Sequence, residues 1–244
     1  MNPWWMAAPV AAAATGVAWW AARSPSAQLY GPTIRTTGRA DTLALTFDDG
    51  PNPNCTPRLL DLLDRFHAQA TFFMIGKYVR RDPELAREVA ARGHLVGNHT
   101  ETHPSLIWRS PGQIESELRQ CDEALESALG AGRTSSSGKW MRPPYGSRGP
   151  QLNSVVTQMK FDGVVMWSLM GYDWKPQPQE KLIHRLQSAR WNRGGGRGGD
   201  VIVLHDGWSR GWNADREHLL QALEYWLPRW KEAGVEFVTA APQA

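Results

Sequence analysis

Two adjacent carboxylates, Asp48 and Asp49, end the apolar run LALTF and are followed at once by Gly50 and Pro51. Exposed acidic pairs are common, but these two close a run that reads as a buried strand. Neighbouring side chains of a strand point to opposite sides, so the pair shares one task only if the backbone turns. A carboxylate at the end of a buried strand costs free energy unless a cation or donors compensate it. The sequence therefore predicts a cation close to this pair.

The segment GNHTETHPS supplies side chains that hold a metal cation. His99 and His103 are four residues apart, close enough on one turn to face the same ion. This spacing alone is more often found without a metal, but here it follows a strand and an earlier strand-end Asp pair. Two imidazoles and one carboxylate would leave coordination positions open for water and substrate, which is typical of a catalytic metal site.

Two further strand-end segments carry candidate functional groups. MRPPYG holds Arg142, whose planar guanidinium suits two-pronged contact with a carboxylate, and DVIVLHDG places His205 at the end of an apolar run. Taken singly, Arg142 fits a surface ion pair equally well, and His205 fits a strand-end histidine with satisfied hydrogen bonds. Their positions relative to the Asp pair and the two histidines favour a shared site.

The elements that must position these residues alternate between short apolar runs and segments with helical periodicity. Strands are expected at residues 42–47, 70–75, 95–98, 163–169, 201–204 and 235–239, and helices at 57–66, 83–92, 110–129, 151–160, 179–190 and 215–233. This order predicts an α/β fold of parallel strands with helical crossovers, a barrel or an open sheet. Functional groups gather at strand ends in such folds. The segments GAGRTSSSGK and RGGGRGGD are expected to be loops.

The N-terminal segment differs from the rest of the chain. Residues 3–22 carry no charge, have about the length of a membrane-spanning helix, and place Trp pairs near both ends. We therefore expect a hydrophobic signal anchor or a cleaved signal peptide over residues 1–23, a linker over 24–41 and one domain over 42–240. Alanine-rich composition and Pro9 weaken the anchor interpretation, and the lack of a preceding Lys or Arg weakens the signal peptide. Either places the domain outside the cytoplasm, with membrane attachment through residues 3–22 in the first case.

Composition excludes some functions and leaves others open. The chain has 244 residues, a net charge of +3 and a pI of about 9.0, but its basic residues are scattered, so we expect no nucleic-acid partner. Thirteen Trp residues are many, and exposed indoles often line sugar-binding grooves, although most are expected in the core. Cys55 and Cys121 are compatible with one bridge or with two buried thiols. Oligomeric state leaves no signal.

In their order along the chain, these motifs resemble a known family. TFDDGP, H-x-x-x-H, R-P-P-Y-G, a D-W pair and V-L-H-D are similar to the motifs of the polysaccharide deacetylases, the NodB-homology domain of carbohydrate esterase family 4. The resemblance runs from about residue 42 to 239. It implies a distorted, incomplete (β/α) barrel and metal-dependent removal of acetyl groups from sugar polymers.

The resemblance also implies roles for single residues. Asp49, His99 and His103 would hold the metal, usually zinc, although such ligands also accept cobalt, nickel or manganese. Asp48 would be the general base and Arg142 would hold it ionised. These roles agree with the chemistry, because a metal ion activates water and polarises an acetyl carbonyl while a neighbouring carboxylate accepts the proton.

On the substrate side, the resemblance makes His205 the general acid that protonates the departing amine. The backbone N–H of Tyr145 would help to stabilise the oxyanion. Tyr145 and Trp174 would wall the acetyl pocket, with Trp208 and Trp212 as weaker candidates for the sugar groove.

One motif departs from the family pattern. WSLMGYDWK has Met170 where the family commonly has an acidic residue that orients the catalytic histidine. A thioether accepts no strong hydrogen bond from an imidazolium. We expect either that Asp173 or another acidic residue takes over, or that His205 has a lower pKa and activity is reduced.

The function that follows is metal-dependent hydrolysis of N-acetyl groups in an N-acetylglucosamine polymer such as peptidoglycan, chitin or poly-N-acetylglucosamine. The same motifs serve relatives that remove O-acetyl groups from xylan or deacylate a lipid-linked sugar. A domain that binds glycan with damaged catalysis is the non-enzymatic alternative. The six intact polar residues of the motifs argue against it, whereas Met170 argues slightly for it.

Overall fold

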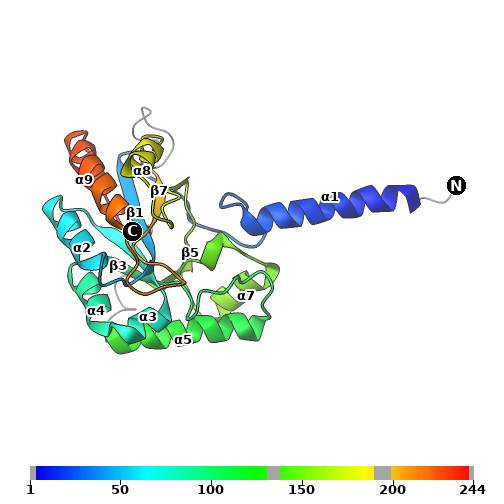
Figure 1. Ribbon diagram of the computed structural model, residues 1–244. Helices are drawn as coiled ribbons and strands as arrows, with labels where there is room; N and C mark the ends of the chain where they lie inside the picture. Colours follow the sequence, from blue (N-terminus) through cyan, green and yellow to red (C-terminus); the bar gives the residue numbers. More distant parts are fainter. Residues whose placement is uncertain (1–3, 131–137, 190–198, 242–244) are drawn as a thin grey trace.

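The computed structural model describes residues 4–130, 138–189 and 199–241. It is an α/β barrel from which one long N-terminal helix projects (Figure 1). The expected loops GAGRTSSSGK and RGGGRGGD lie largely outside the described residues.

Eight strands form the sheet in the described part of the chain. They are β1 (Thr42–Gly50), β2 (Ala70–Met74), β3 (Leu95–Asn98), β4 (Trp140–Met141), β5 (Gly163–Val164), β6 (Leu169–Met170), β7 (Val201–His205) and β8 (Glu236–Phe237). The order is β5-β4-β3-β2-β1-β7-β6, and β8 pairs with the start of β1. All named pairs are parallel, and seven strands curl through 211°. The sheet is therefore the expected incomplete barrel.

Helices cover the outside of this sheet (Figure 1). The described helices are α1 (Trp4–Arg23), which projects from the barrel, and α2 (Thr56–Arg65), α3 (Gly76–Arg81), α4 (Pro83–Ala91), α5 (Pro111–Leu129), the 3₁₀ turn η1 (Pro144–Gly146), α7 (Pro150–Gln158), α8 (Gln179–Leu186) and α9 (Glu217–Glu232). Several begin at signals visible in the sequence. Ser110 caps α5 through a capping box with Gln113, and Asp82 accepts a hydrogen bond from the backbone N–H of Leu85 in α4.

The core lies between the sheet and the helices. Every residue of β1 is buried, and its alternate side chains Leu43, Leu45 and Phe47 pack in one cluster with apolar residues of α2, α8 and α9. Burying a Leu or Phe side chain stabilises a fold by about 1.5–3 kcal/mol, so these three side chains fix this face of the strand against the helices. Cys55 and Cys121 are also buried, and no disulfide joins them.

The expected strand at 163–169 is instead two short strands, β5 and β6. Between them the backbone leaves the sheet, and the carbonyls of Val165 and Met166 accept hydrogen bonds from Arg142. Ile34 bridges to Val165 and donates its backbone N–H to Val164. The segment expected to be a linker thus completes hydrogen bonds at this break. Sequence patterns also missed α3 and β4, which are short.

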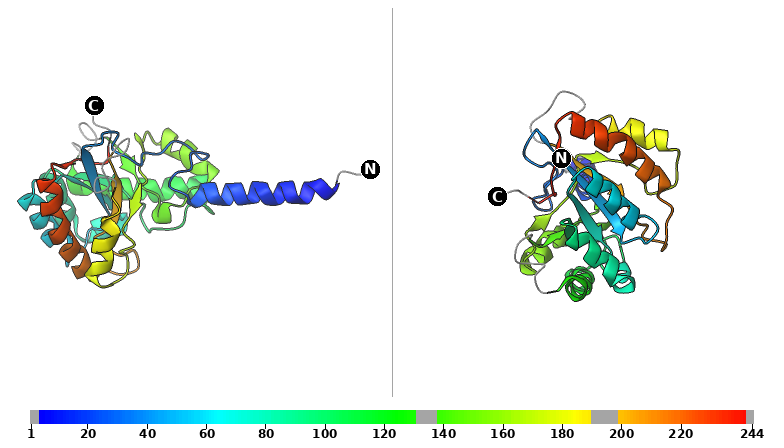
Figure 2. Two further views of the ribbon diagram at one scale, coloured as in Figure 1. Left: turned by 90° about the horizontal axis from the view of Figure 1, so that it is seen from above. Right: turned by 90° about the vertical axis from the view of Figure 1, so that its left-hand side faces the viewer.

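Helix α1 forms over the uncharged N-terminal run and extends away from the barrel in two views (Figures 1 and 2). Its end is fixed to the barrel by Arg148, whose backbone N–H binds the carbonyl of Ala22 and whose guanidinium binds those of Ser24 and Ala27. Among the described residues no helix is both long enough and apolar enough to cross a membrane.

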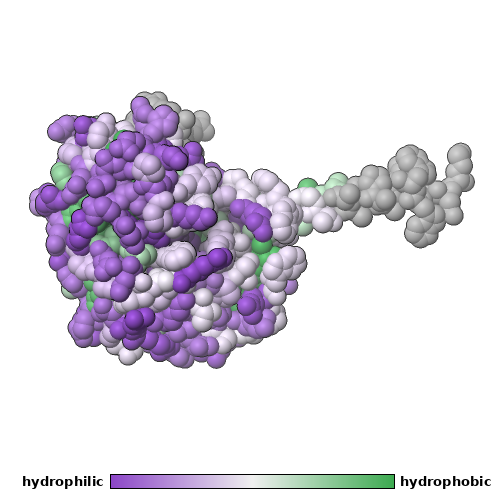
Figure 3. Space-filling model, in the orientation of Figure 1, coloured by the Kyte–Doolittle hydropathy of each residue, from purple (hydrophilic) through white to green (hydrophobic). Residues whose placement is uncertain are grey.

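The surface of the barrel is predominantly hydrophilic on the face seen in Figure 3, with small apolar areas between polar ones. The exposed large apolar side chains of the described residues include Trp19 and Trp20 near the end of α1 and Tyr145 and Trp208 on the barrel. The last two lie at the carboxyl ends of strands, where the sequence places the functional groups.

Candidate active site

A pocket of about 380 Å³ opens at the carboxyl ends of the strands. The predicted site residues that line it are Asp48, Asp49, His99, His103, Tyr145, Trp174 and His205. Arg142 and Asp173 do not line it but are fully buried behind it, each hydrogen-bonded to a lining residue. All nine predicted site residues are therefore brought together.

The candidate metal ligands form one cluster. Ligand atoms of Asp49, His99 and His103 all lie within 4.8 Å of one another, and all three residues are buried. Oδ1 of Asp49 is 3.1 Å from Nε2 of His103 and 3.6 Å from Nε2 of His99. The sequence-distant Asp pair and His pair meet because β1, β2 and β3 are neighbours in the sheet.

The backbone is strained where it presents these side chains. Asp49, Thr100, His103 and Tyr145 have positive φ angles of 70°, 67°, 63° and 59°. Non-glycine residues adopt this region rarely, and each instance costs of order 1–3 kcal/mol. The register between β1 and β2 also shifts between Asp48 and Gly50. This irregularity lets the two neighbouring Asp side chains take different partners.

The chemistry of the cluster fits a divalent metal. Nδ1 of His99 is 2.7 Å from the carbonyl of Arg142 and donates a hydrogen bond to it. The lone pair of Nε2, on the side of Asp49, is then available to coordinate a cation. Oδ1 of Asp49 is buried without a hydrogen-bond partner of acceptable geometry among the described residues. Such orphaned buried atoms are costly unless something binds them. The described residues thus supply a ligand set that a metal ion would satisfy.

Electrostatics keep Asp49 and His99 in the protonation states that a metal needs. Burial alone would raise the pKa of Asp49, but the adjacent His103, with smaller contributions from His205 and His99, holds it well below its usual range. Burial lowers the pKa of His99 to about 4. Asp49 is therefore ionised and His99 neutral near pH 7.

Asp48, which lines the pocket, is paired with Arg142, which is buried behind it. Nη1 of Arg142 donates to Oδ1 of Asp48 at 2.8 Å and to Oγ1 of Thr46 at 2.6 Å. Its Nε and Nη2 donate to the carbonyls of Val165 and Met166. Burial lowers the pKa of Arg142 from its usual value, although Asp48 opposes that shift. A guanidinium remains charged under such conditions, so Asp48 faces a fixed positive charge.

His205 is held by Asp173 rather than by the residue at position 170. Oδ1 of Asp173 lies 2.9 Å from Nδ1 of His205, and Oδ2 accepts the backbone N–H of His205 at 2.8 Å. Burial lowers the pKa of His205, but the charge and hydrogen bond of Asp173 outweigh it and raise that pKa to about 9. Of the two alternatives that the sequence left open, this geometry agrees with Asp173 taking over as the partner of His205 and not with a lowered pKa.

Met170 has a different place. It ends β6, lines the pocket and packs against the apolar cluster that contains Val203 and Trp167. Its carbonyl accepts a hydrogen bond from Arg185. Met170 in place of an acidic residue therefore changes a wall of the pocket but leaves the His205–Asp173 pair in place.

Aromatic rings form other walls. Tyr145 is 57% exposed and its ring meets His103 edge-on, with centroids 4.6 Å apart. Trp174 meets His205 edge-on at 5.8 Å, and Trp208 also lines the pocket. Trp212 is not among the lining residues and packs on Tyr78 instead. Of the two weaker Trp candidates, only Trp208 lies at the site.

Sequence patterns missed several supporting residues. Thr46 is a buried hydroxyl inside an apolar strand, and that anomaly was its only signal. The backbone N–H of Ser209 donates to Oδ2 of Asp49 at 3.2 Å. Asp206, next to His205, is buried, accepts a hydrogen bond from Thr56, and burial raises its pKa to about 7. In the V-L-H-D motif, only His205 stood out as a candidate functional residue.

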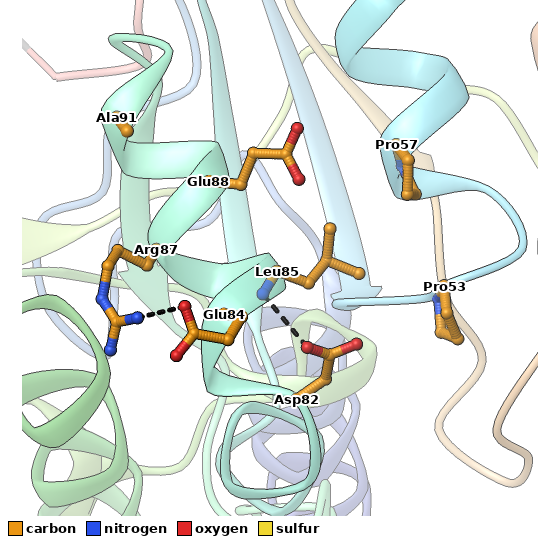
Figure 4. Close-up of a pocket in the computed structure, with 8 residues that line it drawn as sticks. All are labelled: Pro53, Pro57, Asp82, Glu84, Leu85, Arg87, Glu88 and Ala91. Atoms are coloured by element: carbon orange, nitrogen blue, oxygen red, sulfur yellow. Dashed lines mark hydrogen bonds and ion pairs between the residues drawn. The ribbon is translucent and has the colours of Figure 1, made fainter.

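A second hollow, of about 540 Å³, lies between α4 and the start of α2 (Figure 4). Asp82 caps α4 there, and Arg87 pairs with Glu84. Glu88 pairs with Arg92 outside the hollow, and the polar side chains drawn in Figure 4 do not converge on one point. The pocket at the strand ends is therefore the candidate active site.

Comparison with known proteins agrees with the fold and with the family that the sequence motifs resemble. Residues 35–164 match the polysaccharide deacetylase family profile. A chitooligosaccharide deacetylase of Bradyrhizobium sp. (strain ANU 289) is 34% identical over 79% of this chain and 85% of its own length. A peptidoglycan-N-acetylglucosamine deacetylase of Bacillus cereus is 34% identical over 82% of this chain and 86% of its own. The chain belongs to the polysaccharide deacetylase family.

A solved structure supports the same assignment. The crystal structure of the Bc1960 peptidoglycan N-acetylglucosamine deacetylase superposes with a TM-score of 0.71 and 29% identity, over 85% of this chain and 89% of that one. The match covers most of both chains and therefore supports the fold.

Proposed function

We propose that this protein is a metal-dependent hydrolase that removes N-acetyl groups from an N-acetylglucosamine polymer such as peptidoglycan, chitin or poly-N-acetylglucosamine. One observation carries the proposal: the Asp49, His99 and His103 cluster shares a pocket with the Asp48–Arg142 and His205–Asp173 pairs. Relatives named for deacetylation of chitooligosaccharide and of peptidoglycan support the substrate class. Acetylated xylan and a lipid-linked sugar are the alternative substrates.

Asp49, His99 and His103 would hold the ion. Two imidazoles and a carboxylate favour zinc and also accept cobalt, nickel or manganese. When bound, the ion supplies Lewis-acid chemistry, lowering the pKa of water and polarising the acetyl oxygen. Two backbone groups orient the ligands: the carbonyl of Arg142 accepts a hydrogen bond from His99, and the N–H of Ser209 donates one to Asp49.

The remaining residues move protons. Asp48, held in place by its hydrogen bond from Arg142, accepts a proton from the water that attacks the acetyl carbon. His205, protonated through its contact with Asp173, donates its proton to the sugar nitrogen as the C–N bond breaks, which yields acetate and a free amine. The backbone N–H of Tyr145 stabilises the oxyanion. Tyr145 and Trp174 enclose the acetyl group.

The location follows from the substrate. Peptidoglycan and the other polymers lie outside the cytoplasm, so we place the enzyme in the cell envelope or beyond it. The curated relatives from Bacillus cereus and Listeria monocytogenes are named for a peptidoglycan substrate and support this part of the proposal.

The direct test is acetate release by the full chain from N-acetylglucosamine oligomers, peptidoglycan and acetylated xylan. We expect release from the first two, its loss with a chelator and its return with added zinc. Asp48→Asn should abolish it, whereas Asp61→Asn, an exposed carboxylate on α2, should not. Glycan binding without release by a metal-loaded protein would instead identify a glycan-binding domain.

A further inference from the structure

Two cations line the pocket without serving the proposed reaction. Lys175 follows the wall residue Trp174, and Arg210 follows Ser209, whose amide binds the metal ligand Asp49. Both side chains are exposed, and neither has an ion-pair or hydrogen-bond partner among the described residues. By contrast, the described arginines of α2 and α4 mostly pair with acidic side chains on the surface, as Arg58 does with Glu217.

The backbone that carries each cation is anchored. On one segment, Asp173 is fully buried and bonded to His205 two residues before Lys175. On the other, the carbonyl of Trp208 accepts a hydrogen bond from Tyr78 at 3.0 Å, and that of Ser209 accepts one from Lys77 at 2.9 Å. The two charges are therefore held at the pocket by their main chain while their side chains stay exposed.

The pocket offers them no negative partner. The acidic residues that line it are Asp48 and Asp49. Oδ1 of Asp48 binds Arg142, and Asp49 belongs to the metal cluster. An ion bound at that cluster would add further positive charge. A neutral oligosaccharide gives Lys175 and Arg210 only weak hydroxyl acceptors, whereas a carboxylate or phosphate matches an ammonium and a guanidinium.

We infer that Lys175 and Arg210 select glycans that carry a negatively charged group near the acetylated sugar. The inference rests on the proposed function, because it concerns the substrate of the same pocket. A lactyl carboxylate on the neighbouring sugar of a peptidoglycan strand is one source of such a charge, and a sugar phosphate is another. Chitin and unmodified poly-N-acetylglucosamine carry neither.

The experiment compares glycans of equal length with the zinc-loaded full chain. One is an N-acetylglucosamine oligomer, the second is a peptide-free peptidoglycan strand with free lactyl carboxylates, and the third is that strand with the carboxylates methyl-esterified. A fourth, an N-acetylglucosamine oligomer with a terminal phosphate, distinguishes the two sources of charge. Exposed ion pairs are individually weak, so we expect kcat/KM for the free acid or the phosphate to exceed that for its neutral counterpart by about three- to tenfold. High salt should diminish that ratio.

Variants assign the preference to the two residues. Lys175→Gln combined with Arg210→Gln should bring the charged-to-neutral ratio of kcat/KM to about one. Lys231→Gln is the matched control, because it removes an exposed cation from the last turn of α9, outside the pocket, and should keep the wild-type ratio. A wild-type ratio of one or below overturns the inference, as does a double variant that lowers both rates by the same factor.

Binding separates this inference from the proposed reaction. Calorimetric titration of the deacetylated free-acid strand and its methyl ester measures charge selection without turnover. If no glycan releases acetate but the free acid binds about three- to tenfold more tightly than the ester, and the double variant loses that difference, the charge selection stands and the proposed hydrolysis fails. If acetate is released but both strands bind equally tightly, the proposed hydrolysis stands and the charge selection fails.

Discussion

Asp173 holds His205 at two points, with Oδ1 2.9 Å from Nδ1 of the ring and Oδ2 2.8 Å from the backbone nitrogen. Asp173 is fully buried, and His218 contacts its carbonyl oxygen at 2.9 Å. The carboxylate therefore fixes both the position of the histidine and the nitrogen that carries its proton. With Nδ1 engaged, Nε2 is the nitrogen left for the substrate.

Replacing Asp173 by Asn should remove the cause of the raised His205 pKa. In the metal-free protein, NMR titration should give a His205 pKa of about 9 for the wild type and a lower one for Asp173→Asn, because burial is then opposed only by the charges of Asp49 and Asp48. We expect kcat to fall by about 10²–10⁴-fold, as when a general acid loses its orienting carboxylate. A His205 pKa that is the same in the variant as in the wild type would contradict this account.

The same pair makes stability depend on pH. A raised folded-state pKa means that the folded protein binds the proton more tightly than the unfolded chain. The stabilisation by the His205–Asp173 pair is therefore complete below the unfolded pKa of about 6.5 and is lost as pH rises through about 9. Denaturant unfolding of the metal-free wild type and Asp173→Asn should show a difference in unfolding free energy that shrinks as pH rises between those two values. If that difference in unfolding free energy widened with pH instead, the His205 pKa would not be raised in the folded protein.

Met170→Asp tests whether a carboxylate at that position matters. Since Asp173 already binds His205 and Met170 packs beside an apolar cluster, we expect no gain in activity and no shift in the pH profile. The charge should lower the free energy of unfolding by about 1–3 kcal/mol. Met170→Leu, of similar volume, should cost less than about 1.5 kcal/mol. A variant with higher activity or a displaced alkaline limb would show that position 170 does tune His205.

The sequence placed the chemistry better than it placed the backbone that supports it. Strand-end polar residues predicted the location of Asp48, Asp49, His99 and His205, because parallel strands bring their carboxyl ends to one edge of a sheet. The expected strand at 163–169 failed for a reason outside its own sequence. Hydrogen bonds from Arg142 take the carbonyls of Val165 and Met166 out of the ladder. Tertiary contacts of this kind leave no local periodicity to detect.

Substituting Arg142 by Lys should destabilise the fold as well as the reaction. An ammonium keeps the charge but cannot bind Asp48, Thr46 and two carbonyls with one planar group. Breaking a buried pair of this kind costs about 3–5 kcal/mol when one partner is removed, so we expect a loss of about 3 kcal/mol in unfolding free energy. Arg58→Lys, in an exposed pair with Glu217, should change it by less than about 0.5 kcal/mol. Equal losses in the two variants would rule out a special role for the buried pair.

Gly207 is the residue whose lack of a side chain lets the chain just after β7 approach the metal cluster. A Cβ built on it would overlap the backbone carbonyl of Asp49, whereas one built on Gly112 in α5 meets nothing within 4 Å. Gly207→Ala should therefore displace Asp49 and lower zinc affinity by about 10–100-fold, as loss of a supporting contact does in other metal sites. Gly112→Ala should leave affinity unchanged and stabilise the helix by up to about 1 kcal/mol. Competition with a chelator of known zinc affinity measures both variants. If the Gly207→Ala variant binds zinc as tightly as the wild type, the strand end can yield without moving the ligand.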